Sequence, residues 1–221
     1  MASVSAEIER LALDVMTAHG CHTVILYGSR ARGDATASSD VDLLCVRDEG
    51  PSLRDARVVD GLYLDAFVHS EAALATIEPA LLRLLGGVVI REHHDFGTRL
   101  LAQIEELHQR GPLPIPEDER RALMVWARKM LDRIQGRNDV EGDYRRMYLL
   151  VQALEDYFGL RNIWYRGEKE AFAWLRQYDA QAYGLFERAA ASGAGTGAIG
   201  ELIETVYGIS RAETGRGDTE P

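Results

Sequence analysis

One stretch of the sequence constrains the fold of this chain more than any other. A short apolar run at residues 24–27 ends in Gly28 and Ser29, and ten residues separate Ser29 from the pair Asp40 and Asp42. The run is rich in β-forming residues, so it predicts a strand that stops where the glycine allows a turn. Glycine lets the backbone approach an anion closely, and the Ser29 hydroxyl adds a donor, so we expect this turn to bind phosphate.

The pair Asp40 and Asp42 is typical of a strand that holds a metal ion. Alternation along a strand places both carboxylates on one face, while Val41 and Leu43 point to the other, toward the core. Two like charges so close repel each other, and a divalent cation offsets that repulsion. Magnesium prefers carboxylate and phosphate oxygens, so it fits best.

A third acid, Asp65, strengthens this prediction. Residues 58–68 are predicted to form one more strand, with Asp65 as the only ionisable group in its apolar centre. A buried carboxylate needs a partner, and a neighbouring strand that carries Asp40 and Asp42 would gather all three acids around one or two cations. Asp65 could then take the proton from an attacking hydroxyl. The alternative is an edge strand on which Asp65 points into water.

The five positions Gly28, Ser29, Asp40, Asp42 and Asp65 resemble the signature of the nucleotidyltransferase superfamily, which has a DNA polymerase β-like fold. Residues 28–34 look most like the bacterial minimal nucleotidyltransferases, and the downstream part is similar in layout to the aminoglycoside adenylyltransferases. The resemblance implies an α/β (α+β) domain with a small mixed sheet and helices. It also implies two Mg²⁺ ions, ATP as the donor, and nucleotidyl transfer to a hydroxyl with release of pyrophosphate, as in the transferases of EC class 2.7.7.

The resemblance also implies a role for each site residue. Asp40 and Asp42 would hold both ions, and Asp65 would bind the ion nearest the acceptor and act as general base. In some relatives the base comes from the helical domain or a second subunit, so Glu141 and Asp143 remain alternatives. Lys169 lies in the first turn of a predicted helix, where the helix dipole disfavours a cation. That position is tolerable if Lys169 reaches across to the triphosphate. Aminoglycoside adenylyltransferases similarly carry a lysine in a comparable first turn. The predicted nucleotide-binding residues are Gly28, Ser29, Arg30, Ser39 and Lys169.

A proline-rich segment at residues 111–116 divides the chain. We predict a nucleotidyltransferase domain at 1–111, an α-helical bundle at 117–211 that forms the acceptor or substrate domain, and a disordered tail at 212–221. The active site would lie in the cleft between the two domains. The predicted elements are strands at 22–27, 40–46, 60–69 and 88–90, and helices at 6–18, 30–36, 96–108, 117–134, 143–160, 168–176, 180–191 and 199–209, with a further helix starting at Ser70.

Several other residues receive no functional role at this stage. Cys21 and Cys45 lack metal-ligand spacing and are expected to be buried free thiols. His93 and His94 are read as a loop pair without a third ligand nearby. Tyr144 and Tyr148 are four residues apart on a predicted helix, which favours packing in the core.

Composition and charge limit the class of acceptor and the expected cellular location. The formal net charge of −10 argues against a nucleic acid held by broad phosphate contact and favours a cationic acceptor. No apolar run is long enough to span a membrane, and the N-terminus does not read as a signal peptide, so a cytoplasmic location is expected. The favoured acceptor is a small hydroxylated molecule such as an aminoglycoside. The alternatives are an antitoxin-like protein that adenylylates a partner protein, an enzyme that modifies tRNA, and a non-catalytic nucleotide sensor; a homodimer remains an option.

Overall fold

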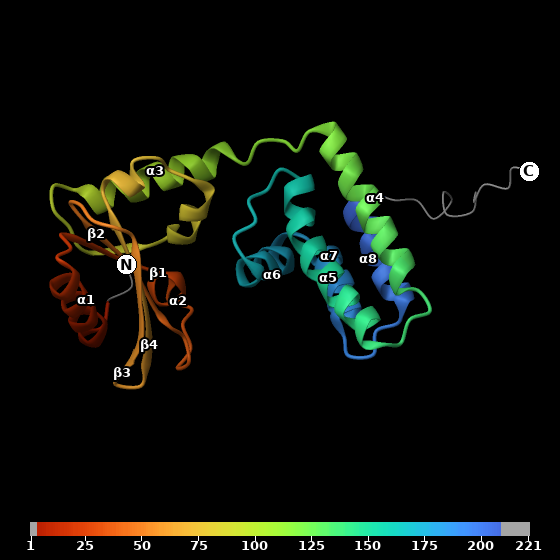
Figure 1. Ribbon diagram of the computed structural model, residues 1–221, viewed down its shortest axis with the longest axis horizontal. Coiled ribbons are helices and arrows are strands. Elements are labelled where there is room, and N and C mark those ends of the chain that lie inside the picture. The colour runs from red at the N-terminus through yellow and green to blue at the C-terminus, as the bar shows by residue number, and fades with distance from the viewer. Residues whose placement is uncertain (1–3, 209–221) are drawn as a thin grey trace, which may run out of the picture. The chain divides into compact units, whose positions relative to one another are not determined.

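The computed structural model describes residues 4–208, and the chain divides into two compact units, Met1–Arg110 and Gly111–Pro221 (Figure 1). Each unit has a hydrophobic core of its own. The tail predicted at 212–221 lies outside the described residues. No helix among residues 4–208 is both long and apolar enough to cross a membrane.

The N-terminal unit is built on a five-stranded mixed sheet with strand order β3-β4-β2-β1-β5. Only β2 and β4 run parallel, and the other neighbours are antiparallel. The predicted fold class, a small mixed sheet with helices followed by a helical bundle, is confirmed. The elements of this unit are α1 (Ala6–His19), β1 (Thr23–Tyr27), α2 (Gly28–Arg32), β2 (Val41–Arg47), β3 (Leu53–Val59), β4 (Leu62–Ser70), η1 (Ala72–Leu74), η2 (Pro79–Leu84), β5 (Val88–Arg91) and α3 (Phe96–Arg110).

The two faces of the sheet have different partners. Helix α1 packs on β1 and β2, where side chains such as Leu26, Leu43 and Ala66 form one buried cluster with it. Successive side chains of a strand alternate between the two faces of a sheet. Asp42, next to Leu43, and Asp65, next to Ala66, therefore point to the opposite face. The acids thus lie on the face opposite α1, where Ile25 and Leu44 are fully buried as well and α3 packs on β1 and β5.

The strand expected over 58–68 starts too early, because the chain turns back at Asp60 and Gly61, whereas the bounds 60–69 are close to those of β4. Strands β3 and β4 are an antiparallel hairpin joined by Asp60 and Gly61, with φ of 52° and 84°. Two consecutive positive φ angles are typical of a type I′ turn, for which Asp-Gly is a strong sequence signal. Alternating apolar residues on both sides of the turn concealed it, and with it the whole of β3.

Two predicted helices of this unit are shorter than expected. Helix α2 ends at Arg32, because Gly33 adopts the left-handed conformation with φ of 84°. The helix predicted from Ser70 is a single 3₁₀ turn at Ala72–Leu74. The residue that caps this turn is Glu71, while the Ser70 hydroxyl before it accepts a hydrogen bond from the Ala73 N–H at 3.3 Å.

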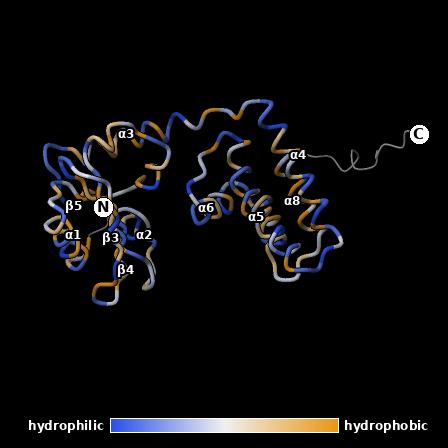
Figure 2. Tube along the Cα trace, in the orientation of Figure 1, coloured by the Kyte–Doolittle hydropathy of each residue, from blue (hydrophilic) through white to orange (hydrophobic). Residues whose placement is uncertain are grey.

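The C-terminal unit contains five helices within the described residues: α4 (Glu117–Ile134), α5 (Val140–Leu160), α6 (Glu168–Tyr178), α7 (Ala180–Ala190) and α8 (Thr196–Tyr207). Hydrophobic stretches recur along α5 and α8 between hydrophilic ones, as the tube in Figure 2 shows. The expected core packing of Tyr144 and Tyr148 is wrong: their exposed fractions are 68% and 51%. The core side of α5 is formed instead by residues such as Leu149 and Ala153.

Candidate functional site

The register of the sheet brings the predicted acids together. Asp42 pairs with Asp65 across the parallel strands β2 and β4, and with Tyr27 across the antiparallel strands β1 and β2. Residues directly opposite each other on neighbouring strands point to the same face. Asp40 lies two positions before Asp42, just ahead of β2. Two strand carboxylates, Asp42 and Asp65, and that of Asp40 ahead of β2 therefore lie close together near the end of β1, where the Gly-Ser turn begins.

The electrostatics of Asp42 show how close these acids are. Burial raises the pKa of Asp42, and the negative charges of Asp40 and Asp65 raise it further. Arg32 and Arg83 lower it, but the net shift remains upward. The charged form of Asp42 is therefore disfavoured until a cation compensates the three carboxylates. An all-oxygen donor set of this kind suits Mg²⁺, so the residues fit the ion that the sequence implies.

Gly28 lies directly against this group of acids. Its φ of +72° is in the left-handed region, and a Cβ added there would lie 2.3 Å from Oδ2 of Asp42. No side chain fits at that distance, so only glycine lets the turn pass the carboxylate. Ser29, the next residue, is buried in the first turn of α2. The turn predicted to bind phosphate and the acids predicted to bind metal are thus immediate neighbours.

The structure shows Arg30 and Ser39 holding the chain that leads to Asp40. The Arg30 guanidinium donates to the main-chain oxygen of Ser39 at 2.7 and 3.2 Å and to that of Asp40 at 3.1 Å. The Ser39 hydroxyl accepts from the Thr36 N–H at 2.9 Å. These bonds position Asp40, while direct contact of Arg30 or Ser39 with a nucleotide stays a prediction.

Arg54 is a site residue that the sequence reasoning missed. It lies on β3, and its guanidinium forms a two-pronged ion pair with Asp65, Nε to Oδ1 at 2.6 Å and one terminal nitrogen to Oδ2 at 2.8 Å. Both oxygens of Asp65 accept from Arg54, so this guanidinium competes with a cation or a proton for the carboxylate. The Asp60-Gly61 turn was the signal that could have revealed β3 and this neighbour.

Arg83 is a second cation that the sequence reasoning missed, because it lies in the unpredicted helix η2. Its guanidinium carbon is 4.3 Å from the ring centroid of Phe67 and 5.8 Å from that of Tyr27. Arg54 approaches the Phe67 ring as well, at 5.2 Å. Burial raises the pKa of Tyr27 to about 12, so this phenol stays neutral beside the acids. Two guanidinium groups at one aromatic ring, next to the carboxylates, are suited to bind phosphate oxygens.

The candidates in the helical unit have other local partners. Glu141 forms ion pairs with Arg137 at 2.8 Å and with Arg145 at 2.5 Å, and hydrogen bonds from these arginines lower its pKa. A lowered pKa makes a carboxylate a weaker base. Asp143 pairs with Arg146 at 3.1 Å. Lys169 lies in the first turn of α6 between two glutamates, and its contact with the triphosphate stays a prediction.

Comparison with known proteins identifies the N-terminal unit. Residues 9–111 match the family model described as a nucleotidyltransferase domain. A solved nucleotidyltransferase-like protein from Exiguobacterium sibiricum is similar over 91% of this chain and 71% of that chain, with 17% identity and a TM-score of 0.39. A similarity that distant carries no argument of its own. No curated protein matches the chain in sequence.

Proposed function

Since residues 9–111 are a nucleotidyltransferase domain, we propose that the protein transfers AMP from ATP to a hydroxyl of a small molecule, such as an aminoglycoside, and releases pyrophosphate. This would make it a magnesium-dependent adenylyltransferase of EC class 2.7.7. The observation that carries the proposal is the pairing of Asp42 with Asp65 beside Gly28. Each of these features alone is common, but a glycine turn packed against three neighbouring carboxylates is suited to a metal-bound triphosphate.

The three acids would have two roles in the reaction, to bind the metal ions and to accept a proton. Asp40, Asp42 and Asp65 would hold two Mg²⁺ ions, which when bound neutralise charge on the attacking and leaving oxygens of an in-line displacement. Asp65 would accept the proton of the acceptor hydroxyl as its oxygen bonds to the α-phosphorus. The bond from that phosphorus to the bridging oxygen breaks at the same time, and pyrophosphate leaves with the electron pair.

The arginines would switch partners when the nucleotide binds. The Arg54 side chain is 59% exposed, so it can move without unpacking the core, and its release would free both oxygens of Asp65. A triphosphate offers the same guanidinium a stronger partner than a single carboxylate. Arg83 would keep its place over Phe67 and face the phosphates from the other side. The ion pair of Arg54 with Asp65 would therefore belong to the nucleotide-free state.

The net charge supports a cationic acceptor. The chain carries 35 acidic residues against 25 lysines and arginines. An acidic surface attracts a polyamine-like or aminoglycoside-like molecule and repels the phosphates of tRNA. This argument concerns the class of acceptor and does not select one compound.

A second candidate function is transfer of AMP to a partner protein. Large apolar side chains are exposed along one side of α5, at Val140, Tyr144, Met147, Tyr148 and Val151. Their spacing by three and four residues places them on one helical face. A contiguous exposed apolar strip marks a surface for another protein more often than one for a small cationic acceptor. This strip favours the antitoxin-like reading over tRNA modification.

The test uses ATP labelled at the α-phosphate, with Mg²⁺ and three acceptor classes in parallel: an aminoglycoside panel, tRNA, and a bacterial lysate. Label on an aminoglycoside, absent with the Asp42→Asn variant, supports the first proposal. Label on a lysate protein, lost when Tyr144 and Met147 are both replaced by serine, supports the second. Equal labelling by wild type and Asp42→Asn would refute the assigned chemistry in either form.

A further inference from the structure

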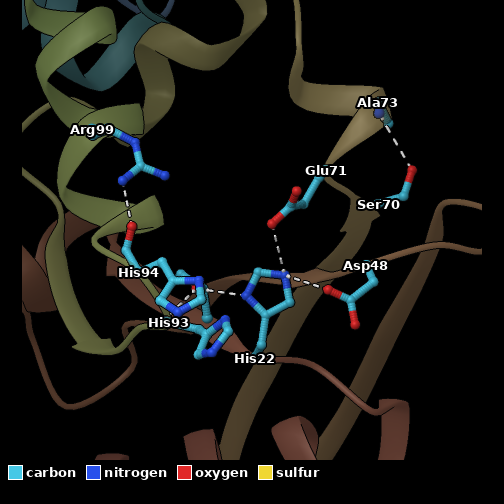
Figure 3. A network of polar contacts seen from close by, with 9 residues as sticks. His22, Asp48, Ser70, Glu71, Ala73, His93, His94 and Arg99 are labelled. Atoms are coloured by element: carbon cyan, nitrogen blue, oxygen red, sulfur yellow. Dashed lines mark hydrogen bonds and ion pairs between the residues drawn. The ribbon is translucent and has the colours of Figure 1, made fainter.

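A second cluster of possible ligands lies at the opposite end of the same sheet. His22 precedes β1, Asp48 follows β2, and Glu71 follows β4, and Figure 3 shows both carboxylates directed at the His22 ring. Gly28 lies at the other end of β1, six residues from His22, which at ~3.3 Å per residue is about 20 Å away. The cluster is therefore separate from the acids of the proposed catalytic site.

Backbone hydrogen bonds fix the segments that carry these side chains. The His22 N–H donates to the main-chain oxygen of Val46 at 2.8 Å, and the Glu71 N–H donates to that of Arg47 at 3.0 Å. Asp48 is the residue directly after Arg47. All three side chains therefore start from main chain anchored to the end of β2, so little ordering is needed to bring them together.

The ligand atoms lie near the spacing that a tetrahedral metal ion requires. His22 Nε2 lies 3.4 Å from Oε1 of Glu71 and 3.8 Å from Oδ1 of Asp48, and the three atoms lie within 4.8 Å of one another. Bonds of roughly 2.0–2.2 Å to a tetrahedral ion would place ligand atoms about 3.4 Å apart. The two carboxylates are 49% and 89% exposed, so small rotations can close the remaining gap.

The contact of His22 Nδ1 with Thr23 orients the imidazole ring. Nδ1 lies 2.9 Å from the Thr23 hydroxyl oxygen, which also accepts from the His93 N–H at 3.3 Å. In the tautomer whose Nδ1–H donates to this hydroxyl oxygen, the lone pair of Nε2 faces the carboxylates. Nε2 is buried and has no hydrogen-bond partner among residues 4–208. Metal-binding histidines commonly donate their second N–H to an oxygen in this way.

We propose that His22, Asp48 and Glu71 bind one zinc-like divalent ion that ties together the ends of β1, β2 and β4. A lone pair aimed at two carboxylates is repulsive unless a cation lies between them. One imidazole and two carboxylates suit Zn²⁺, whereas Mg²⁺ prefers oxygen ligands alone. The ion would brace the strand ends and take no part in nucleotidyl transfer, because it lies away from the phosphate turn, and a water would complete its fourth position. The competing arrangement is a protonated His22 that pairs with both acids without any metal.

The test is zinc binding by the whole chain, measured with a chelating dye in competition. The Asp42→Asn variant serves as the starting protein, because it weakens ion binding at the carboxylate end. We expect one Zn²⁺ per chain, with affinity reduced at least about 100-fold by His22→Gln and by Glu71→Gln. His19→Gln is the matched control, since His19 pairs with a single carboxylate, Asp55, at 3.0 Å, and it should leave zinc affinity unchanged.

A melting experiment gives an independent readout. Stoichiometric Zn²⁺ should raise the melting temperature of the Asp42→Asn and His19→Gln proteins but not of the His22→Gln protein. Zinc affinity unchanged by both His22→Gln and Glu71→Gln would overturn the site. Absence of zinc binding by the folded starting protein, checked by circular dichroism, would overturn it as well and favour the protonated imidazole.

Discussion

Both ends of the sheet in the N-terminal unit gather carboxylates, yet they are built differently. At one end Asp42 and Asp65 are fixed side by side within paired strands. At the other end Asp48 and Glu71 lie just beyond the strands and share a histidine. Partly buried acids on paired strands repel one another and suit a hard ion together with phosphate, whereas more exposed acids beside an imidazole suit a zinc-like ion. The neighbours of a carboxylate, more than the carboxylate itself, decide the chemistry of each end.

Replacing Asp42 with Asn should separate the two ends most strongly. Loss of one ligand that is shared by both ions should lower kcat/KM for nucleotidyl transfer by at least about 10³-fold, which corresponds to roughly 4 kcal/mol. Asp48→Asn at the other end should leave kcat/KM within about twofold. Steady-state assays with labelled ATP measure both variants. Similar losses in the two variants would show that the ends are not independent.

Gly28→Ala should have the next largest effect. Its new Cβ would lie 2.3 Å from the Asp42 carboxylate at a positive φ, so we expect a loss of about 1–3 kcal/mol in the free energy of unfolding and of about 10²-fold in kcat/KM. Gly33→Ala is the matched control, because its φ is also positive but nothing lies within 4 Å of its added Cβ. Urea unfolding and kinetics compare the two. Equal effects would mean that backbone strain alone accounts for Gly28.

Arg54→Ala should have a smaller effect, on the Mg²⁺ concentration that gives half-maximal activity. If Arg54 competes with the ion for Asp65, its removal should lower the Mg²⁺ concentration needed for half-maximal activity by about two- to fivefold, as expected for an exposed ion pair. Arg57→Ala on the same strand is the control, since Arg57 lies beside Asp55 instead. Magnesium titrations of the initial rate measure the change. An increased requirement would show that Arg54 assists ion binding rather than opposing it.

The smallest effect concerns stability without metal. Because the pKa of Asp42 is raised in the folded state, wild-type stability should fall as pH rises from the unfolded pKa near 3.8 to the raised value, and stay lower above it. At pH 7 in a chelator, Asp42→Asn should therefore be more stable than wild type, by less than about 1 kcal/mol. Urea unfolding at several pH values tests this. Mg²⁺ should then stabilise the wild type but not the variant.

The two ends also differ in how far the sequence could predict them. Gly28, Ser29, Asp40 and Asp42 lie close together in the chain, so strand alternation and one turn suffice to predict their arrangement. Asp65 is different, because its pairing with Asp42 requires β4 to run parallel to β2 after the β3–β4 hairpin. The sequence analysis did not predict the Asp60-Gly61 turn, and it therefore did not predict β3 or the position of Arg54. Long-range pairing of this kind leaves no local signal.

The His22 end could not be predicted for the same reason. Its three ligands flank different strands and are separated from one another by more than 20 residues, so no spacing motif connects them. His93 and His94 attracted notice as a pair, but the side chain that meets two carboxylates is His22. Only the sheet topology, which brings the ends of β1, β2 and β4 side by side, reveals the cluster.

The most direct test of the central claim is anomalous diffraction from crystals grown with Mn²⁺ and a non-hydrolysable ATP analogue. Mn²⁺ replaces Mg²⁺ at oxygen ligands and can be located by its own signal. We predict anomalous peaks within about 2.0–2.3 Å of carboxylate oxygens of Asp42 and Asp65, with the triphosphate against the Gly28-Ser29 turn. Nucleotide bound without a peak at these acids, or manganese only at His22, would contradict the account.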